Sequence, residues 1–120
     1  MAKILAVDDS SSMRQMVSFT LKSQNYDVIE AEDGLAALKI AQSNKVDLVL
    51  TDLNMPIMDG LQLIKELRAL PAYKFTPIIM LTTESSEKKK QEGKDAGATG
   101  WLVKPFNPEK LLSTLQRVLG

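Results

Sequence analysis

Cysteine and histidine are both missing from the 120 residues of this chain. Without cysteine there is no disulfide, no thiolate nucleophile and no zinc site built on sulfur. Without histidine, acid–base mechanisms and catalytic triads that depend on an imidazole are excluded as well. Any chemistry must therefore come from carboxylates, hydroxyl groups and the side chains of lysine and arginine.

A net charge of one sign and a long apolar segment are also absent. Fifteen Lys and Arg residues balance fifteen Asp and Glu residues, so the composition does not indicate binding to nucleic acid. The opening MAKILAVDD lacks the apolar core of a signal peptide, and apolar runs such as residues 78–81 are far too short to span a bilayer. We therefore expect a cytoplasmic protein that has no contact with membranes.

The sequence does contain a regular alternation of two apolar patterns. Short apolar runs predict five β-strands, at residues 3–7, 27–31, 47–51, 77–82 and 99–103. Apolar residues at three- and four-residue spacing predict helices, namely Met13, Met16, Val17 and Leu21, then Leu61, Ile64, Leu67 and Leu70, then Leu111, Leu115 and Val118. Residues 34–43 and 87–96 complete five helices.

This (βα)5 order predicts an α/β fold with a doubly wound parallel sheet. The first, third and fourth strands are apolar on both faces, which is typical of a parallel sheet covered by helices on each side. The sequence has no internal repeat, low-complexity tract or linker. We therefore expect one domain over residues 1–120.

Polar residues follow the predicted strands. Asp8 and Asp9 follow the first strand and Asp52 follows the third, while Thr82 ends the fourth and Lys104 follows the fifth. Doubly wound sheets bind their ligands outside the carboxyl ends of the strands, where the strand order reverses. We therefore expect three carboxylates, a hydroxyl and an ammonium group to converge there.

The residues alone leave two interpretations of Asp8 and Asp9 open. One of the pair could cap the next helix with help from Ser10, which is worth about 1 kcal/mol. Bringing Asp52 within about 4 Å of the pair would add repulsion of roughly 4 kcal/mol per close contact at an effective dielectric constant near 20. A cap cannot offset this repulsion but a divalent cation can, and a set of oxygen ligands favours magnesium. We therefore favour a Mg²⁺ site over capping.

The same residues resemble a known family. Asp8-Asp9, the segment TDLNMPIMDG at residues 51–60, Thr82 and the run Lys104-Pro105-Phe106, in this order along the chain, are similar to the receiver domain of two-component response regulators. The short chain and the segment ATGWLVKPF at residues 98–106 resemble the stand-alone receivers of chemotaxis. The resemblance implies a flavodoxin-like fold with strand order 2-1-3-4-5.

The resemblance also implies the chemistry of the site. Asp52 would be the phosphorylation site, a carboxylate nucleophile that forms an aspartyl-phosphate. Asp9 and Asp52 would bind Mg²⁺ directly, with the backbone carbonyl of Asn54 as a third ligand. Asp8 would act on the cation through water.

Three further positions would contact the phosphoryl group or respond to it. Lys104 would pair with the acceptor carboxylate or with a phosphoryl oxygen, and the bond before Pro105 would be cis. The Thr82 hydroxyl would move toward the phosphoryl group and let an aromatic side chain of the last strand turn inward. That side chain is Trp101, where receivers of the flagellar-motor kind usually have tyrosine. The alternative for Trp101 is core packing without a switching role.

Other features of the resemblance are less specific. Asn54 and Glu84 resemble a pair that tunes the lifetime of the phosphoryl group, or are ordinary exposed polar residues. Gly60 would supply a turn conformation that other residues tolerate poorly. Lys88, Lys89 and Lys90 would form a solvated helix face or, with Trp101, part of the surface that binds output partners.

We therefore predict a phosphorylation-dependent signalling switch, which catalyses no more than its own phosphorylation and dephosphorylation. A histidine kinase of the chemotaxis type would be the phosphoryl donor, and an output protein such as the flagellar motor switch would be the partner, with a phosphatase as a further partner. We expect no DNA-binding output domain, because these 120 residues leave no room for one, and we expect a monomer.

Several alternatives stay open. The receiver could serve a non-flagellar output, act as a phosphate sink, or be a scaffold that binds partners without phosphorylation. A Mg²⁺-dependent phosphohydrolase with an Asp nucleophile is disfavoured, because such enzymes of the haloacid-dehalogenase type need Asp-x-Asp and Ser10 occupies the third position. A nucleotide or flavin module is disfavoured because no glycine-rich loop follows the first strand.

Overall fold

The computed structural model describes residues 2–120 and contains the five strands and five helices expected from the sequence. Their bounds are β1 Lys3–Val7, α1 Ser11–Lys22, β2 Asp27–Ala31, α2 Gly34–Ser43, β3 Leu48–Thr51, α3 Gly60–Arg68, β4 Ile78–Thr82, α4 Glu87–Ala96, β5 Gly100–Val103 and α5 Pro108–Leu119, with a short 3-10 helix at Pro71–Tyr73. Within residues 2–120, none of the helices has the length and hydropathy that crossing a membrane would require.

All five strands are parallel and lie in the order β2-β1-β3-β4-β5, which confirms the predicted flavodoxin-like sheet. Val7, the last residue of β1, pairs with Thr51, the last residue of β3. Asp8 and Asp52 are the next residues on these two neighbouring strands. They therefore leave the sheet side by side, although 44 positions separate them along the chain.

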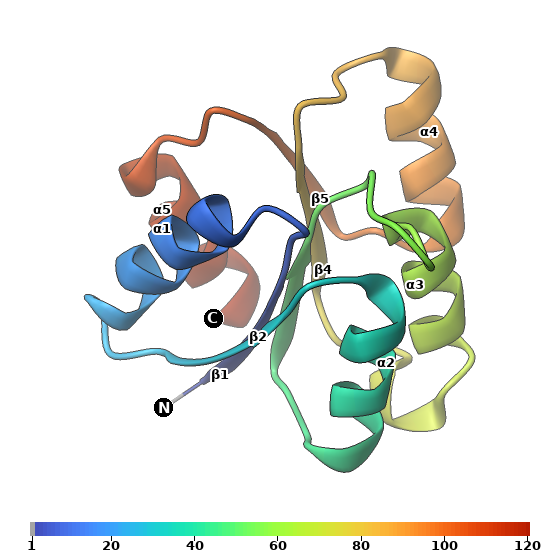
Figure 1. The fold of residues 1–120 in the computed structure, drawn as a ribbon, viewed down its shortest axis with the longest axis horizontal. Helices are drawn as coiled ribbons and strands as arrows, with labels where there is room; N and C mark the ends of the chain where they lie inside the picture. Colours follow the sequence, from blue (N-terminus) through green and yellow to red (C-terminus); the bar gives the residue numbers. More distant parts are fainter. Residues whose placement is uncertain (1) are drawn as a thin grey trace.

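Helices cover both faces of the sheet, with α1 and α5 on one face and α2, α3 and α4 on the other (Figure 1). Successive side chains of a strand point to opposite faces, so one strand supplies both cores. In β1, Ile4 and Ala6 pack on the side of α1 and α5, whereas Leu5 and Val7 pack on the opposite side. All four are buried, as expected for a central strand that is apolar on both faces.

The strand order reverses between β1 and β3. The chain leaves β1 toward α1 on one face and leaves β3 toward α3 on the other (Figure 1). Ligands of doubly wound sheets bind at such a reversal, outside the carboxyl ends of the strands. The residues that directly follow β1 and β3 therefore occupy the position in the fold that is suited to a site.

Two residues of the predicted apolar helix faces lie elsewhere. Met16 is 56% exposed, because α1 buries the stripe that runs through Val17 and Leu21. Leu70 lies beyond the end of α3, where the chain turns into the 3-10 helix, and packs against the core from there. The three-and-four spacing therefore predicts both helices correctly but extends their buried faces too far.

Candidate functional site

Three carboxylates meet at the carboxyl edge of the sheet, between β1 and β3. Oxygen atoms of Asp8, Asp9 and Asp52, one from each, lie within 4.8 Å of one another. Asp8 and Asp52 are buried, whereas Asp9 is exposed. At this separation the buried pair of Asp8 and Asp52 repels by about 3 kcal/mol at an effective dielectric constant of 20, and each pair with exposed Asp9 repels by about 1 kcal/mol at a dielectric constant near 80. The cluster therefore needs positive charge nearby.

Lys104 supplies one positive charge from the end of β5. Its Nζ lies 2.6 Å from Oδ2 of Asp8 and 3.2 Å from Oδ2 of Asp52, and the three side chains are only 8–11% exposed. The peptide bond between Lys104 and Pro105 is cis, as expected. Burial lowers the pKa of Lys104, but the hydrogen bond to Asp8 and the charge of Asp52 outweigh it, so this pKa is raised above its ordinary value. The ammonium group is therefore kept charged between two acids.

Asp8 is held through both of its carboxylate oxygens. Oδ1 accepts a hydrogen bond from the Ser10 amide at 2.9 Å, and Oδ2 accepts one from Lys104. Ser10 itself caps α1, because its hydroxyl oxygen accepts a hydrogen bond from the Met13 amide at 3.3 Å. Capping by an aspartate is therefore wrong as an explanation of the pair, and Ser10 alone takes that role.

The charges and ligand atoms of the cluster fit a hard divalent cation. Three carboxylates and one ammonium group leave a net charge of −2 at the site. None of residues 2–120 donates a hydrogen bond to the Asp9 carboxylate, so this ligand is open, whereas both oxygens of Asp8 are engaged. Asn54 lies exposed in the loop two residues beyond Asp52. Such an oxygen-only set is the kind that Mg²⁺ prefers.

Gly60, in contrast to the prediction, is needed for close packing and not for a turn conformation. It is the first residue of α3, and a Cβ atom there would clash with the carbonyl oxygen of Asp52. The left-handed conformation in this loop belongs to Ile57, with φ of 70°. Gly60 therefore lets α3 begin directly against the backbone of Asp52.

Thr82 and Trp101 contact the same residue of the loop between β4 and α4. Thr82 is fully buried at the end of β4, and its hydroxyl oxygen accepts a hydrogen bond from the Glu84 amide at 3.3 Å. The indole N–H of half-buried Trp101 donates to the Glu84 carbonyl at 2.9 Å. Its ring packs against α4 at Gly93, where a Cβ atom would lie 2.7 Å from the ring. A hydrogen bond from the Ser86 amide lowers the pKa of the Glu84 carboxyl group.

The three consecutive lysines lie in the first half of α4. Lys88 is exposed, while Lys89 and Lys90 pair with Glu92 and Glu87 at 3.3 and 3.9 Å. Exposed pairs of this kind contribute only a few tenths of a kcal/mol. Lys90 and Trp101 also line two surface hollows, of about 360 and 270 Å³. This part of the surface therefore offers positive charge beside an aromatic ring.

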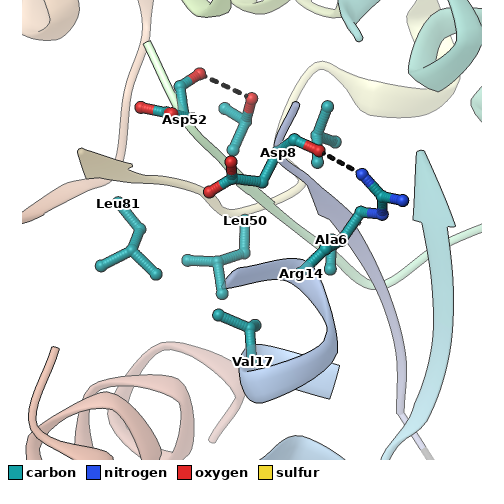
Figure 2. Close-up of a pocket in the computed structure, with 9 residues that line it drawn as sticks. Ala6, Asp8, Arg14, Val17, Leu50, Asp52 and Leu81 are labelled. Atoms are coloured by element: carbon teal, nitrogen blue, oxygen red, sulfur yellow. Dashed lines mark hydrogen bonds between the residues drawn. The ribbon is translucent and has the colours of Figure 1, made fainter. Parts of the chain in front are cut away.

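Sequence reasoning missed one residue beside the acids, Arg14. Figure 2 shows Arg14 reaching from α1 to Asp8, whose carbonyl oxygen accepts a hydrogen bond from Nη1 at 2.6 Å. Arg14, Asp8 and Asp52 all line a small cavity of about 10 Å³ beneath the cluster. The position of Arg14 could have predicted this contact. It lies four residues after the cap Ser10, one turn into the helix, and a long side chain can reach the end of β1 from there.

The fold and the site together define a receiver domain of the CheY type. Residues 4–116 match the family model of the response regulator receiver domain, so the chain belongs to this family. Receiver domains bind Mg²⁺ at an acidic pocket, and CheY-like receivers are generally non-enzymatic signalling proteins of two-component systems. The described residues contain such an acidic cluster.

Particular relatives include chemotaxis proteins. The chain is 43% identical over 120 residues to the chemotaxis protein CheY homolog of Campylobacter jejuni, covering 98% of this chain and 92% of the relative. It is 62% identical to Vibrio cholerae chemotaxis protein CheY4, with a TM-score of 0.95 and 98% of each chain covered. The receiver domain of sensor histidine kinase PA1611 from Pseudomonas aeruginosa was solved with magnesium coordinated in its active-site cleft. That domain is 31% identical, with a TM-score of 0.93, 99% of this chain and 98% of that chain covered.

Proposed function

We propose that residues 1–120 act as one receiver domain that switches chemotaxis signalling by accepting a phosphoryl group on Asp52. The observation that carries this proposal is the meeting of Asp8, Asp9, Asp52 and Lys104 at the carboxyl edge of the sheet. The Asp52 carboxylate is held at one oxygen by the Leu53 amide at 2.7 Å and at the other by Lys104. It is therefore oriented beside groups that can stabilise an incoming anion.

The transfer is an in-line displacement at phosphorus. An oxygen of the Asp52 carboxylate forms the new O–P bond while the N–P bond of a kinase phosphohistidine breaks, and the imidazole leaves with the electron pair. When bound, Mg²⁺ would neutralise charge on the phosphoryl oxygens and on the acids. Asp9, Asp52 and the Asn54 carbonyl would hold it directly, and Asp8 through water. Lys104 pairs with a phosphoryl oxygen.

The phosphoryl group changes the contacts of the loop after β4. The Thr82 hydroxyl donates to a phosphoryl oxygen, which alters its present contact with the Glu84 amide. Because the Glu84 carbonyl binds the indole of Trp101, displacement of this loop also moves Trp101. Asn54 and Glu84 border the site and tune how long the phosphoryl group persists.

The partners follow from chemotaxis relatives and from the surface around Trp101. A histidine kinase of the chemotaxis type donates the phosphoryl group, and a phosphatase removes it. The phosphorylated monomer binds an output protein such as the flagellar motor switch through Trp101 and the lysines of α4, Lys88, Lys89 and Lys90. A non-flagellar output or a role as phosphate sink is the second candidate, favoured by tryptophan at position 101.

Acetyl phosphate tests the acceptor directly. With Mg²⁺ present, intact mass spectrometry should detect one added phosphoryl group in the parent protein and none in Asp52→Asn. The matched control is Asp27→Asn, an exposed acid at the opposite end of the sheet, which should be labelled like the parent. Labelling of Asp52→Asn would refute the assignment. Sustained release of phosphate from p-nitrophenyl phosphate over many turnovers would indicate a phosphohydrolase instead.

A further inference from the structure

The turn that carries Asp8 and Asp9 is tied to two other elements by Arg14. Nη1 of Arg14 donates to the Asp8 carbonyl oxygen at 2.6 Å, and Nε donates to Oε1 of Glu30 on β2 at 3.2 Å. The side chain of Arg14 is 18% exposed and that of Glu30 35%. The guanidinium group thus spans from α1 to β2 across the end of β1. Figure 2 shows its contact with Asp8, beside the acid cluster.

We propose that Arg14, anchored by Glu30, is a positioning residue that holds the backbone of the acid pair in the geometry needed for cation binding. This inference rests on the proposed function, because it assigns a role toward the same site. The Asp8 carbonyl lies between the end of β1 and the start of α1, so it is outside both the strand ladder and the helix. Among residues 2–120, Arg14 is the donor that reaches this oxygen.

Asp9 depends on this backbone more than Asp8 does. Asp8 has its own side-chain hydrogen bonds to Ser10 and Lys104, whereas no group among residues 2–120 donates to the Asp9 carboxylate. The position of the Asp9 ligand is therefore set by the turn itself. Mg²⁺ demands nearly ideal octahedral geometry, so a looser turn weakens binding.

An electrostatic role and a positioning role of Arg14 predict opposite changes in Mg²⁺ affinity when Arg14 is removed. A positive charge beside a cation site repels the cation, so by charge alone the removal of Arg14 should tighten Mg²⁺ binding. If Arg14 acts by holding the Asp8 carbonyl, its removal should weaken binding instead. The sign of the change therefore separates positioning from simple electrostatics.

The first test is a calorimetric Mg²⁺ titration of Arg14→Gln. Loss of a group that orients a metal ligand costs about tenfold or more in affinity, so Kd should rise by about tenfold. The matched control is Arg117→Gln, which removes the same charge from the exposed side of α5 and should leave Kd unchanged. Unchanged or tighter Mg²⁺ binding by Arg14→Gln would overturn the proposal.

The second test needs no metal, so it distinguishes this inference from the proposed function. In metal-free protein, hydrogen exchange of the Asp8 and Ser10 amides, which bond to the Ala31 carbonyl and to the Asp8 carboxylate, should be about tenfold faster in Arg14→Gln. A parent protein that binds no Mg²⁺ refutes the proposed function, while the exchange rates still decide the role of Arg14. Equal exchange rates in parent and variant would overturn that role.

Glu30→Gln provides a milder variant that keeps Arg14. It should accelerate exchange of the same two amides to a smaller extent, because the guanidinium group loses the negative charge of its anchor but keeps an acceptor oxygen at position 30 and the Asp8 carbonyl. Added to Arg14→Gln, it should have no further effect, since Glu30 acts through Arg14. Additive effects in the double variant would refute the anchoring role.

Discussion

The uncompensated negative charge of the acid cluster should reduce stability when no cation is bound, and Asp9→Asn tests this. Asp9 is exposed and holds no hydrogen bond from residues 2–120 through its carboxylate, so the change removes charge without breaking a contact. At 4.8 Å, its repulsion with Asp8 or with Asp52 is about 1 kcal/mol at a dielectric constant of 80 and about 3 kcal/mol at 20. The lower figure applies to an exposed group. Asp9 has two such repulsions, one with Asp8 and one with Asp52, and the positive charge of Lys104 offsets part of their sum. We therefore expect the free energy of unfolding of Asp9→Asn to exceed that of the parent by about 1 kcal/mol.

The assay is urea unfolding followed by far-ultraviolet circular dichroism, with excess chelator and then with Mg²⁺. Without the cation, Asp9→Asn should be the more stable protein. A cation at ten times its Kd stabilises the folded state by about 1.4 kcal/mol. The parent should gain this amount and the variant little of it, because Asp9 is the open ligand of the site. The order of stability should therefore reverse when Mg²⁺ is added.

Two controls test whether the stability change of Asp9→Asn comes from charge repulsion at the acid cluster. Asp27→Asn removes an exposed acid far along the sheet and should show no such reversal. Added monovalent salt should shrink the gain of Asp9→Asn measured without Mg²⁺, because it screens the repulsion. Lower stability of Asp9→Asn than of the parent in chelator, or equal stabilisation of both proteins by Mg²⁺, would refute a destabilising repulsion at Asp9.

Two further substitutions test the neighbours of the cluster. Lys104→Met leaves Asp8 and Asp52 without their shared cation in a setting that is only about a tenth exposed, so it should cost about 3 kcal/mol of unfolding free energy, measured in urea. Gly93→Ala places a methyl group 2.7 Å from the Trp101 ring, so it should cost about 1–3 kcal/mol and make tryptophan fluorescence more accessible to quenching by acrylamide.

Matched changes show what would contradict these two predictions. Lys94→Met removes an exposed lysine of α4 and should leave stability nearly unchanged, so an equal loss in both lysine variants would argue against the buried pairs. At Gly100 a Cβ atom would meet Ile79 at an ordinary 3.7 Å, so Gly100→Ala should leave tryptophan quenching unaffected. Identical quenching in Gly93→Ala and the parent would mean that Trp101 has room to adapt.

Much of the fold was predictable because its signals are local. Strand and helix periodicity depends on residues a few positions apart, and it located all five strands and three of the helices. Residues 34–43 and the weakly patterned residues 87–96 completed the set of five helices. The rule that ligands bind at the carboxyl ends of parallel strands then selected Asp8, Asp9, Asp52, Thr82 and Lys104. The resemblance supplied the strand order and the cis bond at Lys104, both of which the structure confirms.

The contacts around the site were less predictable, because tertiary packing decides which side chains meet there. Lys104 lies closer to Asp8 than to Asp52, Arg14 holds the carbonyl of Asp8, and Gly93 makes room for Trp101. The contacts of Lys104 and Trp101 depend on strand register and on how the helices pack against the sheet, which no local pattern encodes. Arg14 did have a local signal, its place one turn after the cap Ser10, but its bond to the Asp8 carbonyl also needs the turn at the end of β1.

Gly60 and Met16 show the same limit. A glycine at position 60 indicated that a side chain is not tolerated there. The reason is the close approach of the Asp52 backbone and not a turn conformation, which only the tertiary structure showed. Helical spacing placed Met16 on the apolar face of α1, but the sheet covers only part of that face. The sequence by itself determined the elements and which residues stand at their ends, since these follow from short-range periodicity. The tertiary structure decided which side chains touch, since the packing of the whole chain sets those distances.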